Sequence, residues 1–114
     1  MTARATRDPK KIRQILERER AELLALSEAA ADERRPVALD QQSVGRVSRM
    51  DAMQVQAMAQ TVEARRRARL PLIAAALRRL DSGDYGYCVD CGERIPAKRL
   101  AIDPTIARCV DCAG

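Results

Sequence analysis

Two Cys-x-x-Cys pairs near the C-terminus constrain the fold of this chain more than any other feature. Cys88 and Cys91 form the first pair, Cys109 and Cys112 form the second, and 17 residues separate the two pairs. Each pair makes a tight knuckle with both sulfurs on one side, and two facing knuckles supply a tetrahedral sulfur set. Because the chain has no histidine, the ligands are all thiolates and leave no open position for a catalytic water. We predict one structural Zn²⁺ per chain at these four cysteines.

Other uses of four cysteines remain open at this point. An iron–sulfur cluster is the main alternative, because it takes the same ligands. A thioredoxin-like dithiol lacks its βαβ context here, and structural disulfides would need an oxidising compartment. The N-terminus has no apolar signal region and no apolar run reaches membrane length, so we expect a cytoplasmic protein without a membrane span.

The rest of the chain has a helical composition interrupted near Pro36, which disfavours helix at the residue before it. The chain contains two Tyr and neither Phe nor Trp, so aliphatic seams and a metal replace a large core. The predicted organisation is a disordered lead-in over 1–9, helices over 10–31 and 44–80 with a tip over 32–43, and a zinc finger over 81–114. In the tip, Asp40 or Ser43 is the expected N-cap of the second helix.

Each predicted helix carries a seam with 3, 4 spacing. The seam of the first comprises Ile12, Leu16, Glu19, Leu23, Leu26 and Ala30. The seam of the second comprises Val47, Met50, Gln54, Ala57, Thr61, Ala64 and Ala68, followed by Leu70, Ile73, Leu77 and Leu80. Pro71 should kink the second helix or mark a join, and Gly83 suits the left-handed position after its end.

These seams predict a mainly α fold: an antiparallel coiled-coil hairpin followed by a small four-cysteine zinc finger. A single amphipathic first helix on some other surface is the alternative. We find no nucleophile–base pair, open metal position or phosphate-binding glycine loop, so we expect no enzyme.

The finger sequence "DYGYCVDCGERI…KRL…PTIARCVDC" resembles the zinc finger of the DksA/TraR family, bacterial factors that bind RNA polymerase. The agreement includes both cysteine pairs, Tyr87, Gly92, Arg99-Leu100 and Pro104-Thr105. The family order, hairpin then finger, matches residues 10–112. The resemblance implies a transcription regulator whose hairpin enters the secondary channel of RNA polymerase. We expect the chain to be a monomer.

In the family, an acidic Asp-x-x-Asp-x-Ala motif at the hairpin tip carries the effect on initiation. An ungapped count places "VGRVSRM", 44–50, at that motif, with Ser48 in place of the second acid. Asp40, Ser48 and Arg49 are therefore the candidate polymerase-facing residues of an atypical tip. Arg65 matches a basic position that contacts polymerase in the family, although a solvated charged face explains it equally well.

Family members that bind guanosine tetraphosphate use basic residues on the long helix, before Pro-Thr in the finger, and on a helix after the last cysteine. Leu72 and Asp103 occupy the first two positions here, and the 114 residues contain no counterpart of the third. An acid at Asp103 should repel a polyphosphate. We therefore expect no strong dependence on this nucleotide.

Two further functions remain as alternatives. A zinc-ribbon nucleic-acid binder would use the finger cations Arg94, Lys98, Arg99 and Arg108, and the formal charge of +5 fits an acidic partner. Scarce aromatic residues and nearby acids weigh against it. A thiol-based redox sensor would release zinc on oxidation, since zinc-bound sulfurs are thiolates.

Overall fold

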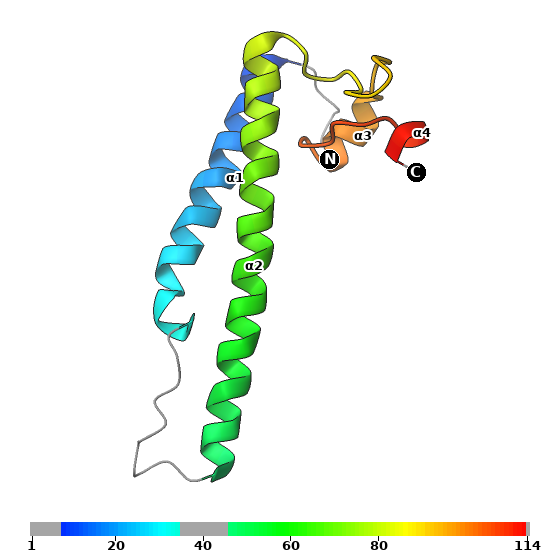
Figure 1. Ribbon diagram of the computed structural model, residues 1–114. Coiled ribbons are helices and arrows are strands. Elements are labelled where there is room, and N and C mark those ends of the chain that lie inside the picture. The colour runs from blue at the N-terminus through cyan, green and yellow to red at the C-terminus, as the bar shows by residue number, and fades with distance from the viewer. Residues whose placement is uncertain (1–7, 35–45, 114) are drawn as a thin grey trace. The chain divides into compact units, whose positions relative to one another are not determined.

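The computed structural model describes residues 8–34 and 46–113 (Figure 1). Its elements are α1 (Pro9–Ala29), the 3₁₀ helix η1 (Ala31–Arg34), α2 (Arg46–Ser82), α3 (Ala97–Ile102) and α4 (Val110–Ala113). No strand occurs among these residues, and one isolated antiparallel bridge joins Tyr87 to Arg94. None of the described helices is long and apolar enough to cross a membrane. The mainly helical fold class is therefore as predicted.

Asp8 and Pro9 determine where α1 begins. Pro9 is the first helical residue, where its missing N–H is not needed. The Asp8 carboxylate accepts a hydrogen bond from the Lys10 backbone N–H at 3.0 Å, which caps the helix. The helix thus begins one residue earlier than predicted and ends two residues earlier, at Ala29. Residues 1–7 of the expected lead-in lie outside the described residues.

The second helix is one element from Arg46 to Ser82, and Pro71 lies within it without marking a join. Gly83 ends it with a φ of +81°, the left-handed conformation expected at that position. The Arg79 carbonyl accepts the backbone N–H groups of Asp84 at 2.9 Å and Tyr85 at 3.1 Å. The candidate N-caps Asp40 and Ser43 lie outside the described residues.

The chain divides into two compact units, and the first combines α1 up to Ala21 with the chain from Leu70 onward. In this unit the first half of α1 runs antiparallel to the last turns of α2 (Figure 1). Its helical core contains Ile12 and Leu16 from α1 with Ile73 and Ala76 from α2. Arg13 pairs with Asp81 on the same side of the unit. Apolar burial thus holds the hairpin together at the end that leads into the finger.

The second unit, Glu22–Arg69, corrects the predicted seam of α2. Ala57, Thr61, Ala64 and Ala68 are all exposed, and Met50 is 57% exposed. The covered positions are Gln56, Ala59, Glu63 and Arg66. They continue the 3, 4 spacing of Leu70 and Ile73 backward along the helix, whereas the predicted seam followed small residues one or two positions away. On α1, Leu26 is 51% exposed, whereas Leu23, Ser27 and Ala30 are the half-buried positions near the end of the helix.

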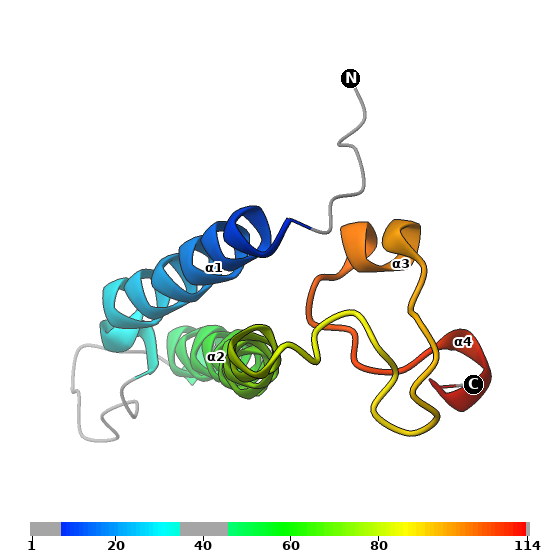
Figure 2. The ribbon, with the colours of Figure 1, turned by 90° about the horizontal axis from the view of Figure 1, so that it is seen from above.

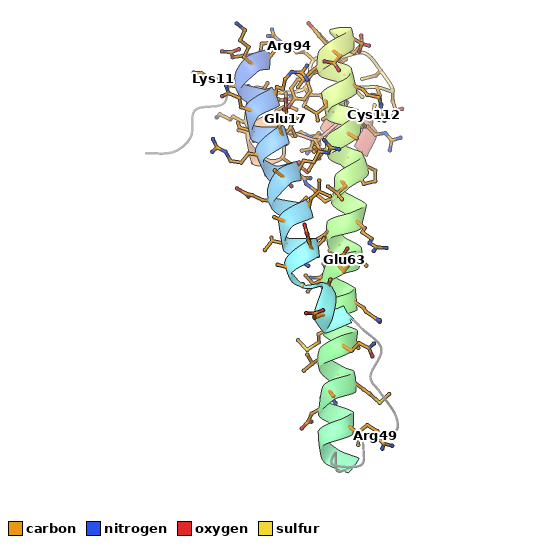
Figure 3. All side chains as sticks on the ribbon, turned by 90° about the vertical axis from the view of Figure 1, so that its left-hand side faces the viewer. Lys11, Glu17, Arg49, Glu63, Arg94 and Cys112 are labelled. Atoms are coloured by element: carbon orange, nitrogen blue, oxygen red, sulfur yellow. The ribbon has the colours of Figure 1, made fainter. Side chains whose placement is uncertain are left out.

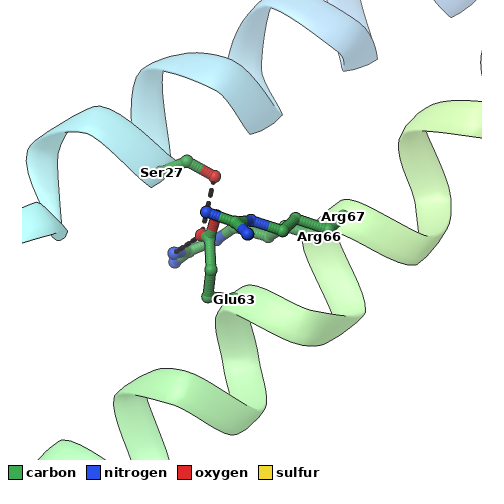
Figure 4. A network of polar contacts seen from close by, with 4 residues as sticks. All are labelled: Ser27, Glu63, Arg66 and Arg67. Atoms are coloured by element: carbon green, nitrogen blue, oxygen red, sulfur yellow. Dashed lines mark hydrogen bonds and ion pairs between the residues drawn. The ribbon is translucent and has the colours of Figure 1, made fainter. Parts of the chain in front are cut away.

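A buried acid explains why a charged position lies in this seam. Glu63 is only 6% exposed, and its Oε1 accepts a hydrogen bond from Ser27 Oγ of α1 at 2.8 Å (Figure 4). Its Oε2 accepts from Arg67 Nε at 3.0 Å, and Arg66 Nη1 lies 3.5 Å from Oε1. A buried carboxylate is tolerated when it is paired and hydrogen-bonded in this way. The Ser27–Glu63 bond therefore joins α1 to α2 by a polar contact.

Candidate metal centre

The four cysteine thiols lie together, all four Sγ atoms within 4.8 Å of one another. The Sγ atoms of Cys91 and Cys109 are 3.6 Å apart, and no pair is bonded as a disulfide. Tetrahedral zinc with bonds of about 2.3 Å requires sulfur–sulfur distances of about 3.8 Å. The geometry and the all-thiolate donor set therefore fit a structural Zn²⁺.

Backbone hydrogen bonds shape each knuckle. In the first, the Cys88 carbonyl accepts the Gly92 N–H at 2.9 Å, and Gly92 takes a φ of +77°. The Cys88 N–H donates to the Glu93 carbonyl at 2.7 Å. In the second, the Cys109 carbonyl accepts the Ala113 N–H at 2.9 Å, so that α4 carries Cys112 back beside Cys109. Glycine is suited to the left-handed turn because it has no Cβ.

The two knuckles are also tied to each other. The Val89 N–H donates to the Ala107 carbonyl at 2.9 Å, and Arg108 Nε pairs with Asp90 Oδ2 at 2.8 Å. Arg99 Nε of α3 donates to the Arg108 carbonyl at 3.3 Å. These contacts keep the two cysteine pairs close to each other, and none of them involves a sulfur atom.

Little apolar material lies beneath the cluster. Cys88, Ile95 and Leu100 are buried together, and Tyr85, Ile106 and Cys109 pack against them. Loops make up most of the finger, and α3 and α4 are short (Figure 2). So small a core leaves much of the folding energy of this segment to metal binding.

The electrostatics of the four thiols call for a cation. Backbone hydrogen bonds from Cys109 and Cys91 lower the pKa of the Cys88 thiol to about 6. In contrast, a hydrogen bond with the Cys109 side chain, followed by those with Cys88 and Cys91, raises the pKa of Cys112. Close thiols resist ionising together, so a divalent cation is needed to hold four thiolates at neutral pH.

Two side chains connect the finger to the end of α2. Arg79 Nη2 donates to the Thr105 carbonyl at 3.2 Å, and the Tyr85 hydroxyl donates to the Pro104 carbonyl at 2.7 Å. Burial lowers the pKa of the Arg79 guanidinium, as expected for a charge partly removed from water. The Asp103 carboxylate accepts both the Thr105 N–H at 3.0 Å and its Oγ1 at 2.8 Å. Asp103 thus shapes the loop that the helix contacts.

Comparisons with known proteins agree with this architecture. The family model of the prokaryotic dksA/traR C4-type zinc finger matches residues 83–114. The structure of transcription factor DksA2 from Pseudomonas aeruginosa matches with a TM-score of 0.72 and 28% identity, covering 92% of this chain and 79% of that one. Residues 83–114 thus belong to the dksA/traR C4-type zinc-finger family.

Curated relatives in the DksA/TraR family match over a shorter segment. The RNA polymerase-binding transcription factor DksA of Haemophilus influenzae is 46% identical over 48 residues, 42% of this chain and 33% of that protein. Its Escherichia coli counterpart is 38% identical over 48 residues, covering 42% and 32%. The matched segment thus spans about a third of the length of these DksA proteins.

Three of the remaining residues predicted from the DksA/TraR resemblance lie along α2: Ser48, Arg49 and Arg65. Asp40 lies outside the described residues, and Ser48 belongs to the first turn of α2 without a described side chain. Arg49 is half-buried near the start of α2 (Figure 3). Arg65 is exposed farther along the helix. The structure does not bring Arg49 and Arg65 together. Their roles stay predictions.

Sequence reasoning missed two groups of residues that organise this fold. Glu63 was not among the predicted seam positions, although counting back from Ile73 in steps of 3 and 4 reaches it. Arg79 and Tyr85 gave no signal, because they donate to backbone carbonyls that any residue would offer.

Proposed function

We propose that this protein is a non-enzymatic, cytoplasmic regulator of transcription that binds RNA polymerase through its secondary channel. One Zn²⁺ bound by Cys88, Cys91, Cys109 and Cys112 stabilises the finger. The observation that carries the proposal is the match to DksA2, because it covers 92% of the chain and so includes the hairpin as well as the finger. The curated DksA relatives are named as RNA polymerase-binding factors.

In this proposal the hairpin tip enters the channel, with Asp40, Ser48 and Arg49 as the residues facing polymerase. The tip lacks the paired acids of the family motif, so binding and the usual effect on initiation are separable properties. Arg65, exposed on α2, is a candidate contact with acidic groups of the channel wall.

Polymerase binding is testable by crosslinking. A photoreactive residue at position 48 should crosslink to core RNA polymerase, because the tip would be enclosed by the channel. The same residue at position 102 is the control, since Ile102 is 85% exposed and belongs to the finger. Crosslinking from position 48 should also fall when an established secondary-channel factor is added in excess. A complex that never forms with purified polymerase would reject the proposal.

We further propose that guanosine tetraphosphate contributes little to this complex. Leu72 is neutral and 50% exposed, and the Asp103 carboxylate is anionic and already engaged with Thr105. A charge-assisted hydrogen bond to a phosphate contributes about 1.5–3 kcal/mol. The loss of two such contacts weakens binding by at least about a hundredfold.

Titration of the nucleotide onto the protein–polymerase complex tests this point. The polymerase should lack any other site for the nucleotide. We expect no saturation in the micromolar range with the natural chain and a gain of roughly tenfold in affinity for Leu72→Lys. Micromolar affinity in the natural chain would show that other residues replace the missing cations.

The structure disfavours direct nucleic-acid binding by the finger. Two of its four cations make internal contacts, Arg108 with Asp90 and Arg99 with the Arg108 carbonyl. A redox-sensing role stays a prediction, and the exposed Cys91 and Cys112 are where an oxidant would reach the cluster.

A further inference from the structure

One stretch of α2 is exposed to solvent and contains only uncharged side chains. Residues 52–62, "AMQVQAMAQTV", contain no charged side chain, in a chain where charged residues make up 32%. Only Gln56 and Ala59 in this stretch are partly covered; the other nine are exposed. Solvated helix faces normally carry charges, so this composition indicates a face that another surface covers.

The large apolar side chains of this stretch form one stripe, which we call the α2 stripe: Val55, Met58 and Val62. They are 56%, 70% and 43% exposed, respectively. Their spacing of three and four residues places them on one face of the helix. Together with Ala30 and Ala59 they line a groove within the second unit. Small neighbours such as Ala57 and Thr61 would let another helix approach closely.

Charges of opposite sign bound the α2 stripe. Asp51 lies seven residues before Met58 and Arg65 seven residues after it, and both are exposed. Residues seven apart share a helix face, so both charges lie in line with the stripe. Reversing the direction of the helix about Met58 exchanges Asp51 with Arg65 and brings Val55 to within one residue of the position of Val62. The face is therefore complementary to a second copy of itself in antiparallel orientation.

We infer that the α2 stripe is a self-association surface, through which two copies of this chain pair antiparallel about Met58. Asp51 of each copy lies beside Arg65 of the other, and Val55 of each copy packs one residue out of register with Val62 of the other. Such a two-fold interface uses the same patch on both copies. This inference departs from the monomer expected from the sequence.

Pairing through the α2 stripe has a functional consequence that rests on the proposed function. The same part of the hairpin would enter the secondary channel, so a paired chain could not enter it. Polymerase would then bind only the free monomer, and self-association would lower the concentration of protein that can bind it. Self-association itself does not depend on polymerase binding, so the two ideas fail separately.

Analytical ultracentrifugation of the zinc-loaded full chain tests the inference, from low micromolar to several hundred micromolar protein. We expect a reversible monomer–dimer equilibrium in this range. Met58→Asp should weaken it by on the order of a hundredfold, because Met58 lies at the centre of the interface. Ile102→Asp is the matched control: it is an exposed apolar residue on the finger and should leave association unchanged. A chain that stays monomeric throughout overturns the inference.

A charge exchange distinguishes the antiparallel arrangement. Asp51→Arg alone and Arg65→Asp alone each place like charges opposite one another, and each should weaken dimerisation roughly tenfold. An equimolar mixture of the two variants should restore it, because every Arg then faces an Asp. The double variant, Asp51→Arg with Arg65→Asp, should also associate normally. If the mixture fails to associate, the antiparallel pairing is wrong.

Discussion

Replacing Cys109 with serine should release the zinc and unfold residues 84–112 while most of the helical signal remains. A serine hydroxyl is a poor substitute for a thiolate, so the cluster loses one of its four ligands. The finger has only a small core of Cys88, Ile95 and Leu100 to hold it without metal. The helical core around Leu16 and Ile73 is built from other residues and should persist.

Metal analysis, far-ultraviolet circular dichroism and amide hydrogen exchange together measure this result. We expect about one zinc per natural chain and none in Cys109→Ser, with exchange protection lost in the finger alone. Val110→Ser is the matched control, because Val110 adjoins Cys109 but is 61% exposed. It should keep both metal and protection. A coloured iron cluster in anaerobically purified protein would reject the zinc assignment.

Leu16→Ala should lower the free energy of unfolding of the hairpin by about 2–5 kcal/mol. Leu16 is 0% exposed, so its truncation leaves a cavity in the helical core. Leu24→Ala is the matched control on the same helix, since Leu24 is 47% exposed and should cost less than about 1 kcal/mol. Urea denaturation followed by circular dichroism gives both values. Equal effects of the two substitutions would mean that α1 packs by another face.

The centre of the fold was predictable where the signal is local or strongly apolar. The spacing of Cys88, Cys91, Cys109 and Cys112 specifies two knuckles, and the structure brings all four thiols together. Ile12, Leu16 and Ile73 stand out in the seams because they are large and apolar, and all three are buried.

The register of the α2 seam was not predictable in the same way. Ala57 and Ala64 were chosen as apolar positions, yet Glu63 is the buried one. Its burial depends on Ser27, 36 residues away, which supplies a hydrogen bond that no local pattern shows. Apolar periodicity predicts a seam less well where a polar contact between distant residues, and not apolar packing, joins the helices.

The buried Glu63 fixes how α1 is aligned along α2. Sliding α1 by one turn would shift it about 5.4 Å along α2 and carry Ser27 away from the carboxylate. A buried acid that loses its partner is costly, whereas alanine-rich positions on their own would accept several alignments. The Ser27–Glu63 bond therefore selects one alignment of the two helices and sets how much of α2 extends past the end of α1. Under the proposed function, that overhang sets how far the tip reaches into the polymerase channel.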